Sequence, residues 1–328
     1  MSRMIMSRTP LRITFVGGGT DIPAYFRNYD SGAVISASMN KYIHIAVNKK
    51  FDNSFRISYS STEIVDKVDE IKHPSVREAL KLLGINGGIE IVSISDVPSR
   101  GTGLGSSSTF LVGLLNALHA YLGDYASPKQ LAEEAVKIER EILSEPGGLQ
   151  DQYMAAYGGI QVMRFYSSGM VSTDPVIMSG DFLSELEQSM ILLYTGIERN
   201  STTIHASQQQ NVKEKLKEYD SMKGLVSKLL EALGANSVEG VGRTMHENWM
   251  LKRSLADGIS DQHIDSIYDK AIELGAYGGK LIGAGGGGFL LFIASQKVQE
   301  NIISTFPNLR RENFRFDFRG SRIVFVGD

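Results

Sequence analysis

Glycine is concentrated in three short segments, and these segments constrain the fold more than any other feature of the sequence. The chain contains 34 glycines in 328 residues, more than the usual share of about 7%. The clusters lie at residues 17–19, 101–105 and 278–288. Because glycine costs up to ~1 kcal/mol relative to alanine inside a regular element, each cluster predicts a loop. In such a loop the backbone can approach a ligand or another backbone closely.

Patterns of apolar residues between the clusters indicate an α+β fold. They predict strands over residues 10–16, 42–48, 54–59, 88–95, 159–165, 190–194, 289–294 and 322–326. They predict helices over residues 106–122, 151–157, 208–233, 238–255 and 261–274, and one that opens at Pro128. The first strands suggest an antiparallel sheet near the N-terminus, and the mixture of strand runs and helical runs favours α+β over a parallel α/β fold. The pattern loosens near residues 175–180, which predicts two domains, 1–178 and 179–328.

Composition excludes several classes of protein. The formal net charge is −3, from 34 basic and 37 acidic residues, so no strong field attracts nucleic acid or an acidic membrane. Cysteine is absent, which excludes disulfides, cysteine-ligated zinc, iron–sulfur clusters and a cysteine nucleophile. The chain start has no apolar run typical of a signal peptide, and the most apolar stretches are too short to span a membrane. We therefore expect a cytoplasmic protein.

The second glycine cluster predicts a phosphate-binding loop. Its sequence, PSRGTGLGSSS at residues 98–108, follows a predicted strand and opens a predicted helix. Glycines let successive N–H groups point inward, and the helix N-terminus adds about half a positive charge. Phosphate suits such a place, and Ser106, Ser107 and Ser108 add hydroxyls for phosphate oxygens or magnesium. The alternative is a tight turn with serine caps.

Ser106 excludes two other phosphate-binding motifs at this loop. A Walker A loop has a lysine after its last glycine, and a dinucleotide fingerprint has its last glycine at this place.

The other two glycine clusters also predict close approaches. Four consecutive glycines precede a strand in the sequence KLIGAGGGGF, more than a turn needs; a flexible hinge is the alternative. The first cluster is followed by Thr20 and Asp21. The Asp21 carboxylate could bond sugar hydroxyls, or it could cap a helix over residues 22–29.

Two further carboxylates are candidate functional groups. Asp151 follows a glycine pair at a helix start, where a carboxylate can act as a base or as an N-cap. Glu139 lies in the preceding helix, and beside a phosphate loop it would suit magnesium. Taken singly, each is typical of a surface charge. The sequence His246-Glu247 begins like a zinc-protease motif, but Met250 stands where that motif needs a second histidine.

Together these segments resemble the GHMP kinase superfamily, which includes galactokinase, homoserine kinase, mevalonate kinase and phosphomevalonate kinase. The family's three motifs occur in order, as the start from Pro10 to Asp21, the phosphate loop and the glycine loop at residues 283–286. The acidic stretch GGLQDQ at residues 147–152 matches as well. The segments PLRITFVGGGTD, GGLQDQYMAAYGG and GAYGGKLIGAGGGGF are similar to those of D-glycero-D-manno-heptose 7-phosphate kinases. Fucose kinases share the GGGTD start, whereas galactokinases carry His or Glu there, which disfavours galactose.

The resemblance implies a two-domain fold, with an N-terminal phosphate-loop domain and a C-terminal ferredoxin-like domain. It implies ATP binding by Pro98, Arg100, Gly101, Gly103, Leu104, Gly105, Ser106, Ser107 and Ser108, and Mg²⁺ binding by Ser107 and Glu139. Many members have Ala at the place of Ser108, which leaves open which serine meets the metal. Asp151 matches the catalytic aspartate, and Arg12 matches the basic residue near the transferred phosphoryl group. Sugar binding is implied for Gly18, Gly19, Thr20, Asp21, Gly285 and Gly286.

The predicted activity is ATP-dependent phosphorylation of the anomeric hydroxyl of D-glycero-D-manno-heptose 7-phosphate. The alternatives are a 1-kinase for another sugar such as fucose, and a non-catalytic sugar/ATP sensor on the same fold. A sugar phosphate needs a cationic pocket, for which Lys41, Arg199, Lys252 and Arg253 are candidates. The expected partners are the sugar phosphate and ATP, with no nucleic acid and no membrane. The oligomeric state is left open, a homodimer included.

Overall fold

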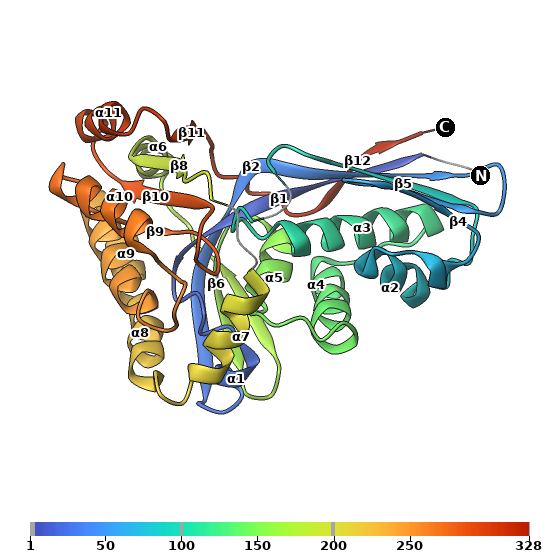
Figure 1. Ribbon diagram of the computed structural model, residues 1–328, viewed down its shortest axis with the longest axis horizontal. Helices are drawn as coiled ribbons and strands as arrows, with labels where there is room; N and C mark the ends of the chain where they lie inside the picture. Colours follow the sequence, from blue (N-terminus) through green and yellow to red (C-terminus); the bar gives the residue numbers. More distant parts are fainter. Residues whose placement is uncertain (1–3, 99–100, 198–200, 328) are drawn as a thin grey trace.

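The computed structural model describes residues 4–98, 101–197 and 201–327, which form two sheets covered by helices (Figure 1). An eight-stranded sheet occupies the right and centre of the view, and a four-stranded sheet lies at the left. This arrangement confirms the predicted α+β class.

The larger sheet is built mainly from antiparallel pairs, as predicted for the N-terminal strands. Its strand order is β12-β1-β2-β5-β3-β4, with β6 between β2 and β7 off this path. The bounds are β1 Ile5–Val16, β2 Ser31–Lys49, β3 Phe55–Ser58, β4 Thr62–Val65, β5 Ile89–Ser95, β6 Ile160–Tyr166, β7 Val171–Pro175 and β12 Arg322–Val326. Strands β3 and β5 pair in parallel, which the antiparallel prediction missed.

Strand β2 pairs with β1, β5 and β6. The sequence predicted only its second half. Its first part pairs with β6, from Ser31↔Tyr166 to Ala37↔Ile160. Its second part pairs with β5, from Ile43↔Ser95 to Lys49↔Ile89. The first part was not predicted because most of it is buried on both faces, so it lacks the alternation that marks a half-buried strand.

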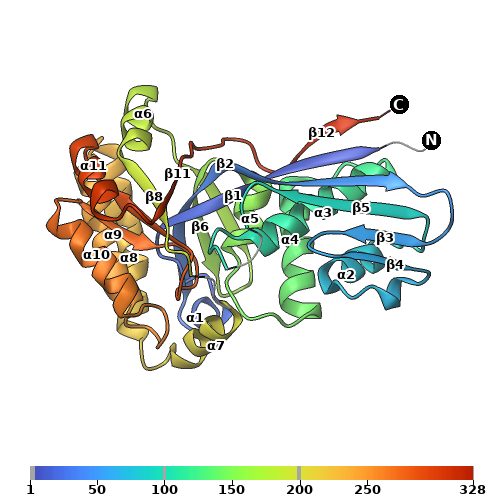
Figure 2. The same cartoon turned by 45° about the horizontal axis from the view of Figure 1, so that its top comes forward.

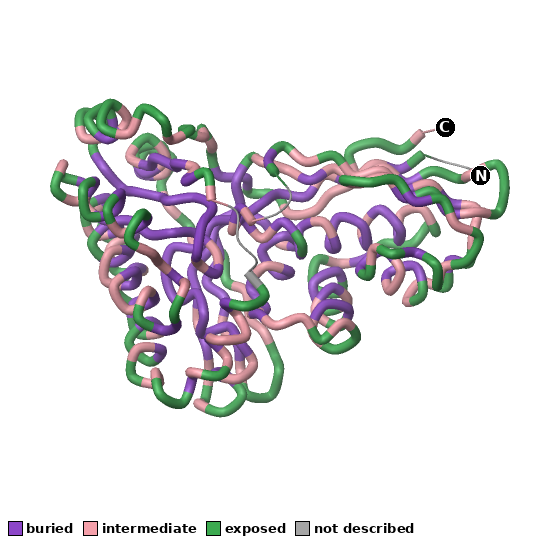
Figure 3. Tube along the Cα trace, viewed as in Figure 1, coloured by how far each residue is buried: buried purple, intermediate pink, exposed green. Residues whose placement is uncertain are grey.

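Helices cover one face of the larger sheet. They are α2 (Pro74–Leu82), α3 (Ser106–Leu122), α4 (Pro128–Val136), which continues into a π-helical turn (Lys137–Ile142), and α5 (Gln150–Tyr157). A short 3₁₀ turn (Val68–Glu70) precedes α2. The bounds of α3 agree with the prediction, and Figure 3 shows α3 as a largely buried element beneath the sheet. A helix that is apolar on most sides is normally buried in this way.

The smaller sheet carries the remaining helices. Its strand order is β11-β8-β10-β9, with β8 Met190–Tyr194, β9 Gly278–Leu281, β10 Phe289–Ile293 and β11 Arg310–Glu312. The helices are α6 Gly180–Gln188, α7 Ser201–Asn211, α8 Leu216–Gly234, α9 Val238–Lys252, α10 Gln262–Glu273 and α11 Gln296–Thr305, while the short α1 (Pro23–Phe26) belongs to the first half of the chain. Figure 2 shows α8, α9 and α10 stacked at the end of the molecule away from α2.

The predicted single helix over residues 208–233 is wrong, because the chain turns at residues 212–215 between α7 and α8. The carbonyl of Asn211 accepts from the Lys215 N–H at 2.9 Å and also, in a tighter three-residue turn, from the Glu214 N–H at 3.1 Å. The turn contains no glycine or proline, so the sequence has no breaker signal there.

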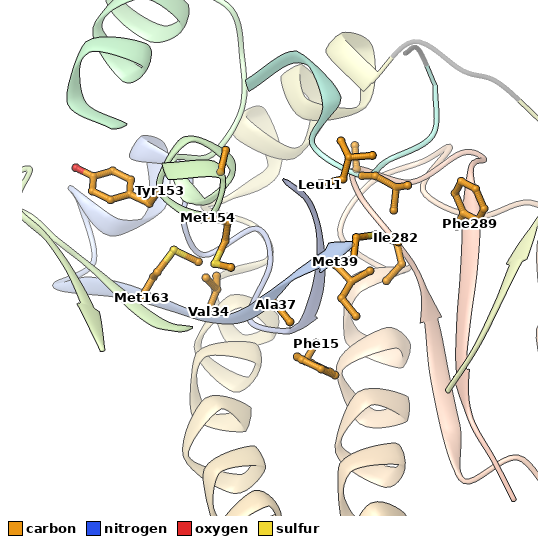
Figure 4. Packing of buried hydrophobic residues seen from close by; sticks show 14 of the residues in the cluster. Leu11, Phe15, Val34, Ala37, Met39, Tyr153, Met154, Met163, Ile282 and Phe289 are labelled. Carbon is orange, nitrogen blue, oxygen red and sulfur yellow. The ribbon is translucent and has the colours of Figure 1, made fainter. Parts of the chain in front are cut away.

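The two halves share a continuous core. Figure 4 shows Leu11 and Met39 of the larger sheet beside Ile282, close to the smaller sheet. Helices α8 and α9 also pack against β1. The predicted division at residue 178 remains a prediction; the last strand, β12, returns to the first sheet and pairs with β1. Among the helices of the described ranges, none is both long and apolar enough to cross a membrane.

Two glycine loops meet backbone to backbone between the sheets. A Cβ added to Gly103, in the phosphate loop, would lie 2.2 Å from the carbonyl oxygen of Ile282. A Cβ added to Gly283 would lie 2.5 Å from the Cα of Gly103. The prediction that a glycine cluster marks a close backbone approach is therefore confirmed.

We expect Gly103→Ala to lower the free energy of unfolding more than Gly84→Ala does. Both glycines have positive φ angles (+74° and +67°), but a Cβ at Gly84 would meet nothing within 4 Å. Both variants should therefore lose about 1–2 kcal/mol from left-handed strain, and Gly103→Ala about 1–3 kcal/mol more from overpacking. Urea unfolding measures both, and equal losses would contradict direct contact of the two loops.

Candidate functional site

The phosphate loop borders a cleft of about 640 Å³ between the two halves of the molecule. The loop joins β5 to α3, and Gly105, with φ 78°, stands at the N-cap of α3. Of the predicted ATP-binding residues, the cleft is lined by Gly101, Gly103, Gly105, Ser106, Ser107 and Ser108. Leu104 is buried behind the loop and Pro98 is exposed before it. Arg100 lies outside the described residues.

The first residues of α3, Ser106, Ser107 and Ser108, line this cleft, so the N-terminus of the helix borders it. The first N–H groups of a helix have no partner within it, and the helix dipole favours an anion there. The N-cap residue is a glycine, so it has no side chain that could occupy these donors.

Glu139 lies beside the phosphate loop and is held by several donors. Its carboxylate accepts from Ser107 Oγ at 3.1 Å and from Ser108 Oγ at 2.7 Å. Gln152 Nε2 also donates to it. Ser107 is exposed toward the cleft, whereas Ser108 is buried. Both serines thus reach the carboxylate and line the cleft, but Ser107 is the more exposed of the two.

The donor set around Glu139 fits magnesium. Magnesium takes oxygen ligands and is usually held by one or two carboxylates together with phosphate oxygens. Glu145, at the same cleft, adds negative potential; burial raises the pKa of its carboxyl group, and the charge of Glu139 raises it further. Over the described residues, no three His, Asp or Glu side chains group as a protein-only metal site. Ser107 and Glu139 therefore offer two oxygen donors at the cleft, to which phosphate oxygens would have to be added.

Arg12 and Asp151 form a buried ion pair between the loops. Arg12 Nε and Nη2 donate to the two carboxylate oxygens of Asp151, each at 2.7 Å. Arg12 Nη1 also donates to the carbonyl of Gly103, and the Arg12 N–H donates to the carbonyl of Leu104 at 3.1 Å. Burial alone would raise the pKa of Asp151, but the Arg12 charge and its hydrogen bonds lower it below the usual value. Asp151 is therefore an ionised carboxylate at neutral pH.

Asp151 stands in the first turn of α5, but it does not cap that helix. The N-cap position is Leu149, whose apolar side chain makes no capping bond. The structure therefore excludes the N-cap role that the sequence left open beside that of a base. It places Asp151 on the walls of both cavities.

Asp21 ties the first glycine turn to the start of α5. One of its carboxylate oxygens accepts from the Gly19 N–H at 2.9 Å, and the other accepts from the Gln150 N–H at 3.2 Å. The alternative role, as a cap for a helix over residues 22–29, is wrong, because α1 is short and starts without a side-chain cap. Thr20 is buried and donates to the carbonyl of Ala33 at 2.8 Å.

A smaller cavity of about 40 Å³ lies behind the ion pair and shares several walls with the cleft. Of the predicted sugar-binding residues, Gly19 and Asp21 line it. A Cβ at Gly18 would lie 3.7 Å from Lys252 Nζ. Gly285 lines the cleft, whereas Gly286 lines neither cavity and donates its N–H to the carbonyl of Ile259 at 2.9 Å.

Of the three phosphate-pocket candidates that the structure describes, Lys252 lines the smaller cavity. It donates to the carbonyl of Gly283 at 2.7 Å. Burial lowers the pKa of its ammonium group to about 8, although Asp21 opposes the shift. Lys41 is paired with Glu312, and Arg253 lies 3.5 Å from Asp265. Arg199, the fourth candidate, falls outside the described residues.

Two residues at both cavities were not predicted from the sequence. Arg140 donates twice to the carbonyl of Gly148, at 3.1 and 3.0 Å. His205, on α7, also lines both cavities. Arg140 could have been found as the neighbour of Glu139, but a single histidine in a polar helix gives no signal.

A third cavity, of about 350 Å³, lies on the other side of the α3 start. Ser106 and Ser107 line both it and the cleft, and its other walls include Tyr59, Val97 and Phe110. A partly apolar pocket next to a phosphate loop suits the base of a nucleotide.

Comparisons with known proteins agree with this architecture. The models "GHMP kinases N terminal domain" and "GHMP kinases C terminal" match residues 71–159 and 229–309. A D-glycero-alpha-D-manno-heptose 7-phosphate kinase from Campylobacter jejuni is 33% identical over 325 residues, 94% of each chain. An L-fucokinase/L-fucose-1-P guanylyltransferase from Bacteroides fragilis is 26% identical over 94% of this chain and 37% of its own length. The solved structure of a D-glycero-D-manno-heptose 1-phosphate kinase from Bacteroides thetaiotaomicron matches with a TM-score of 0.81 at 23% identity, covering 99% of this chain and 100% of that one.

These matches extend over both halves of the chain, and the relatives include kinases for several sugars. The chain therefore belongs to the GHMP kinase family and is a sugar kinase.

Proposed function

We propose that this sugar kinase transfers the γ-phosphoryl group of ATP to the anomeric hydroxyl of D-glycero-D-manno-heptose 7-phosphate. The product would be the 1,7-bisphosphate, a precursor of nucleotide-activated heptose for surface glycans. The observation that carries this proposal is the 33% identity over 94% of both chains to the Campylobacter jejuni heptose 7-phosphate kinase. A 1-kinase for another sugar is the second candidate, supported by the match to the Bacteroides fragilis fucokinase.

The cavities around the phosphate loop support ATP as the donor. The triphosphate would lie against Gly101, Gly103 and the N-terminus of α3, with the base in the partly apolar cavity beyond Ser106. Ser107 and Glu139 would hold magnesium with the phosphate oxygens. The ion supplies charge neutralisation on those oxygens when it is bound.

The ion pair supports the transfer step itself. The acceptor oxygen bonds to the γ-phosphorus, the bond from that phosphorus to the β,γ-bridging oxygen breaks, and ADP leaves. Phosphoryl transfer depends mainly on positioning and on neutralising charge. Arg12 would face the charge on the phosphoryl oxygens, and Asp151 would accept the proton of the attacking hydroxyl. An anomeric hydroxyl is more acidic than an ordinary alcohol, so a carboxylate is an adequate base.

The cations of the smaller cavity support an acceptor that carries its own phosphate. Its walls include three cations, Arg12, Arg140 and Lys252, and two carboxylates, Asp21 and Asp151. Arg12 is paired with Asp151, and Arg140 Nη2 lies 3.7 Å from a carboxylate oxygen of Glu139. Lys252 donates to the carbonyl of Gly283, so it is the cation with which a phosphate of the acceptor would pair.

Replacement of Asp151 by Asn should lower kcat by about 100- to 10,000-fold, the usual contribution of a general base. The affinity for ATP should not fall, because the phosphate loop is untouched and Arg12 remains available to the γ-phosphoryl group. Steady-state kinetics and calorimetry measure the two quantities. Asp174→Asn is a matched control, because Asp174 pairs with Arg164 at 2.8 Å on the exposed surface. Unchanged turnover in a folded Asp151→Asn variant would refute the role of Asp151.

Replacement of Ser107 by Ala should weaken the binding of Mn²⁺–ATP by about tenfold, within the range found for losing an interaction at a metal site. Ser108→Ala should have a smaller effect, because the Ser108 hydroxyl is buried against Glu139 and only orients it. Electron paramagnetic resonance of bound Mn²⁺ measures both affinities. The reverse order would assign the metal to Ser108 instead.

A panel of sugars tests the substrate directly. We expect ATP consumption with D-glycero-D-manno-heptose 7-phosphate, and much less with free fucose, mannose or galactose, because only the phosphorylated sugar would pair with Lys252. Turnover with a free sugar alone would retain the kinase mechanism and reject the heptose assignment. ATP binding without turnover of any sugar would favour the sensor.

A further inference from the structure

His205 is held at the junction of the two cavities by the anchoring of α7. Three residues after it, Gln208 Nε2 donates to the carbonyl of Ala284 in the third glycine loop, at 3.3 Å. Tyr219 on α8 donates to the carbonyl of Gln208 at 3.3 Å, and Asn211 Nδ2 donates to the carbonyl of Leu255 at 3.1 Å. Residues three and four apart share a helix face, so this anchored face carries His205. The backbone that carries His205 is therefore held in place relative to the glycine loop at residues 283–286.

The imidazole has an unsatisfied ring nitrogen. Nδ1 of His205 is shielded from solvent and has no hydrogen-bond partner in the described part of the chain. Buried side-chain polar atoms in native proteins nearly always have a partner. At the wall of two cavities, a ligand can supply that partner.

His205 is a neutral imidazole at physiological pH. Burial, followed by the nearby positive charge of Lys252, lowers the pKa of His205 to about 4. A neutral imidazole has one nitrogen that donates and one that accepts. It can therefore exchange hydrogen bonds with a hydroxyl group, but it adds no charge that would bind a phosphate.

Several other polar groups at the smaller cavity differ from His205 in what they can bind or are already engaged. Arginine and lysine side chains only donate, and ionised carboxylates only accept. Gln150 Oε1 already accepts from Thr14 Oγ1 at 2.7 Å and from Ser36 Oγ at 2.9 Å. The amide nitrogen of Gln208 is bonded to Ala284. Compared with these groups, His205 combines an unengaged nitrogen with the ability to accept from a hydroxyl.

We propose that His205 is a specificity-determining residue that binds a ring hydroxyl of the sugar acceptor through Nδ1. This inference rests on the proposed function, because it requires a sugar in the smaller cavity and the adjoining part of the cleft. The contact would fix the rotation of the ring relative to Asp151, so that the acceptor hydroxyl points at the phosphoryl group. Sugars lacking that hydroxyl, or with it inverted, would be discriminated against at this position.

The test is a thermodynamic cycle that combines His205 variants with deoxy analogues of the substrate, in the manner of a double-mutant cycle. With D-glycero-D-manno-heptose 7-phosphate as probe, kcat/KM is measured for the native enzyme and for His205→Leu, on the parent sugar and on each ring monodeoxy analogue. We expect one hydroxyl whose removal costs the native enzyme about 10- to 100-fold in kcat/KM, the range for leaving a buried polar partner unsatisfied. His205→Leu should lose a similar factor on the parent sugar. Removing that same hydroxyl should then cost His205→Leu little more.

Two further variants separate recognition from packing. His205→Asn keeps an amide group near the position of Nδ1. In this variant, removal of the recognised hydroxyl should still lower kcat/KM, though less than in the native enzyme. His246→Leu serves as the control, because His246 lies on α9, away from the cavities, and its Nδ1 shares a hydrogen bond with the Tyr268 hydroxyl at 2.9 Å. This variant should lower the melting temperature without coupling to any single hydroxyl.

The outcomes distinguish this inference from the proposed function. For every ring hydroxyl, the loss in kcat/KM from its removal and the loss from His205→Leu could simply multiply. If the native enzyme still turns over the heptose phosphate, that result would overturn the role of His205 and leave the substrate proposal standing. If another sugar of the panel is the acceptor, the same cycle with its deoxy analogues tests His205 independently of the heptose assignment. Should His205→Leu fail to fold, His205→Asn and the deoxy analogues decide the question. Failure of all sugars to react would overturn both proposals.

Discussion

The direct contact between the phosphate loop and the third glycine loop is the constraint on which the site depends. Gly103 and Gly283 touch through backbone atoms alone, so no side chain separates the two loops at this point. This approach puts the N-terminus of α3 on the same cleft as Gly283, Ala284, Gly285 and Gly287. It also leaves the Gly103 carbonyl free to accept from Arg12. A side chain at either glycine would separate the loops, and the ion pair would lose one of its supports.

The second consequence is electrostatic. Arg12, Asp151, Asp21 and Lys252 lie in a small enclosed volume, where charges interact more strongly than in water. Burial alone raises the pKa of Asp151 and lowers that of Lys252, and the neighbouring opposite charges counter both shifts. The site is therefore stable as a charged assembly because its members neutralise one another. Removing one member would change the protonation of the rest.

The sequence predicted the local elements of this site better than their assembly. The strand, loop and helix around Ser106 are local, and glycine spacing with an apolar helix behind it was enough to predict them. The first half of β2 was missed because it is buried on both faces, so its apolar and polar residues do not alternate. The break at residues 212–215 was missed because it lacks glycine and proline. His205 and Arg140 reach the cavities only through contacts between distant segments, which no local pattern encodes. That Arg12 and Asp151, 139 residues apart, belong to one site came from the family resemblance alone.

The ion pair with Arg12 controls how strong a base Asp151 can be. The same bond to Arg12 that keeps Asp151 ionised also makes it a weaker base. A γ-phosphoryl group entering the cleft would compete with Asp151 for the Arg12 guanidinium, because phosphate oxygens also suit its bidentate donors. As Arg12 turned toward the phosphate, the burial of Asp151 would dominate and its pKa would rise. Binding of ATP would thus increase the basicity of Asp151 before the acceptor hydroxyl gives up its proton. The carbonyl of Gly103 would keep Arg12 near both partners during this exchange.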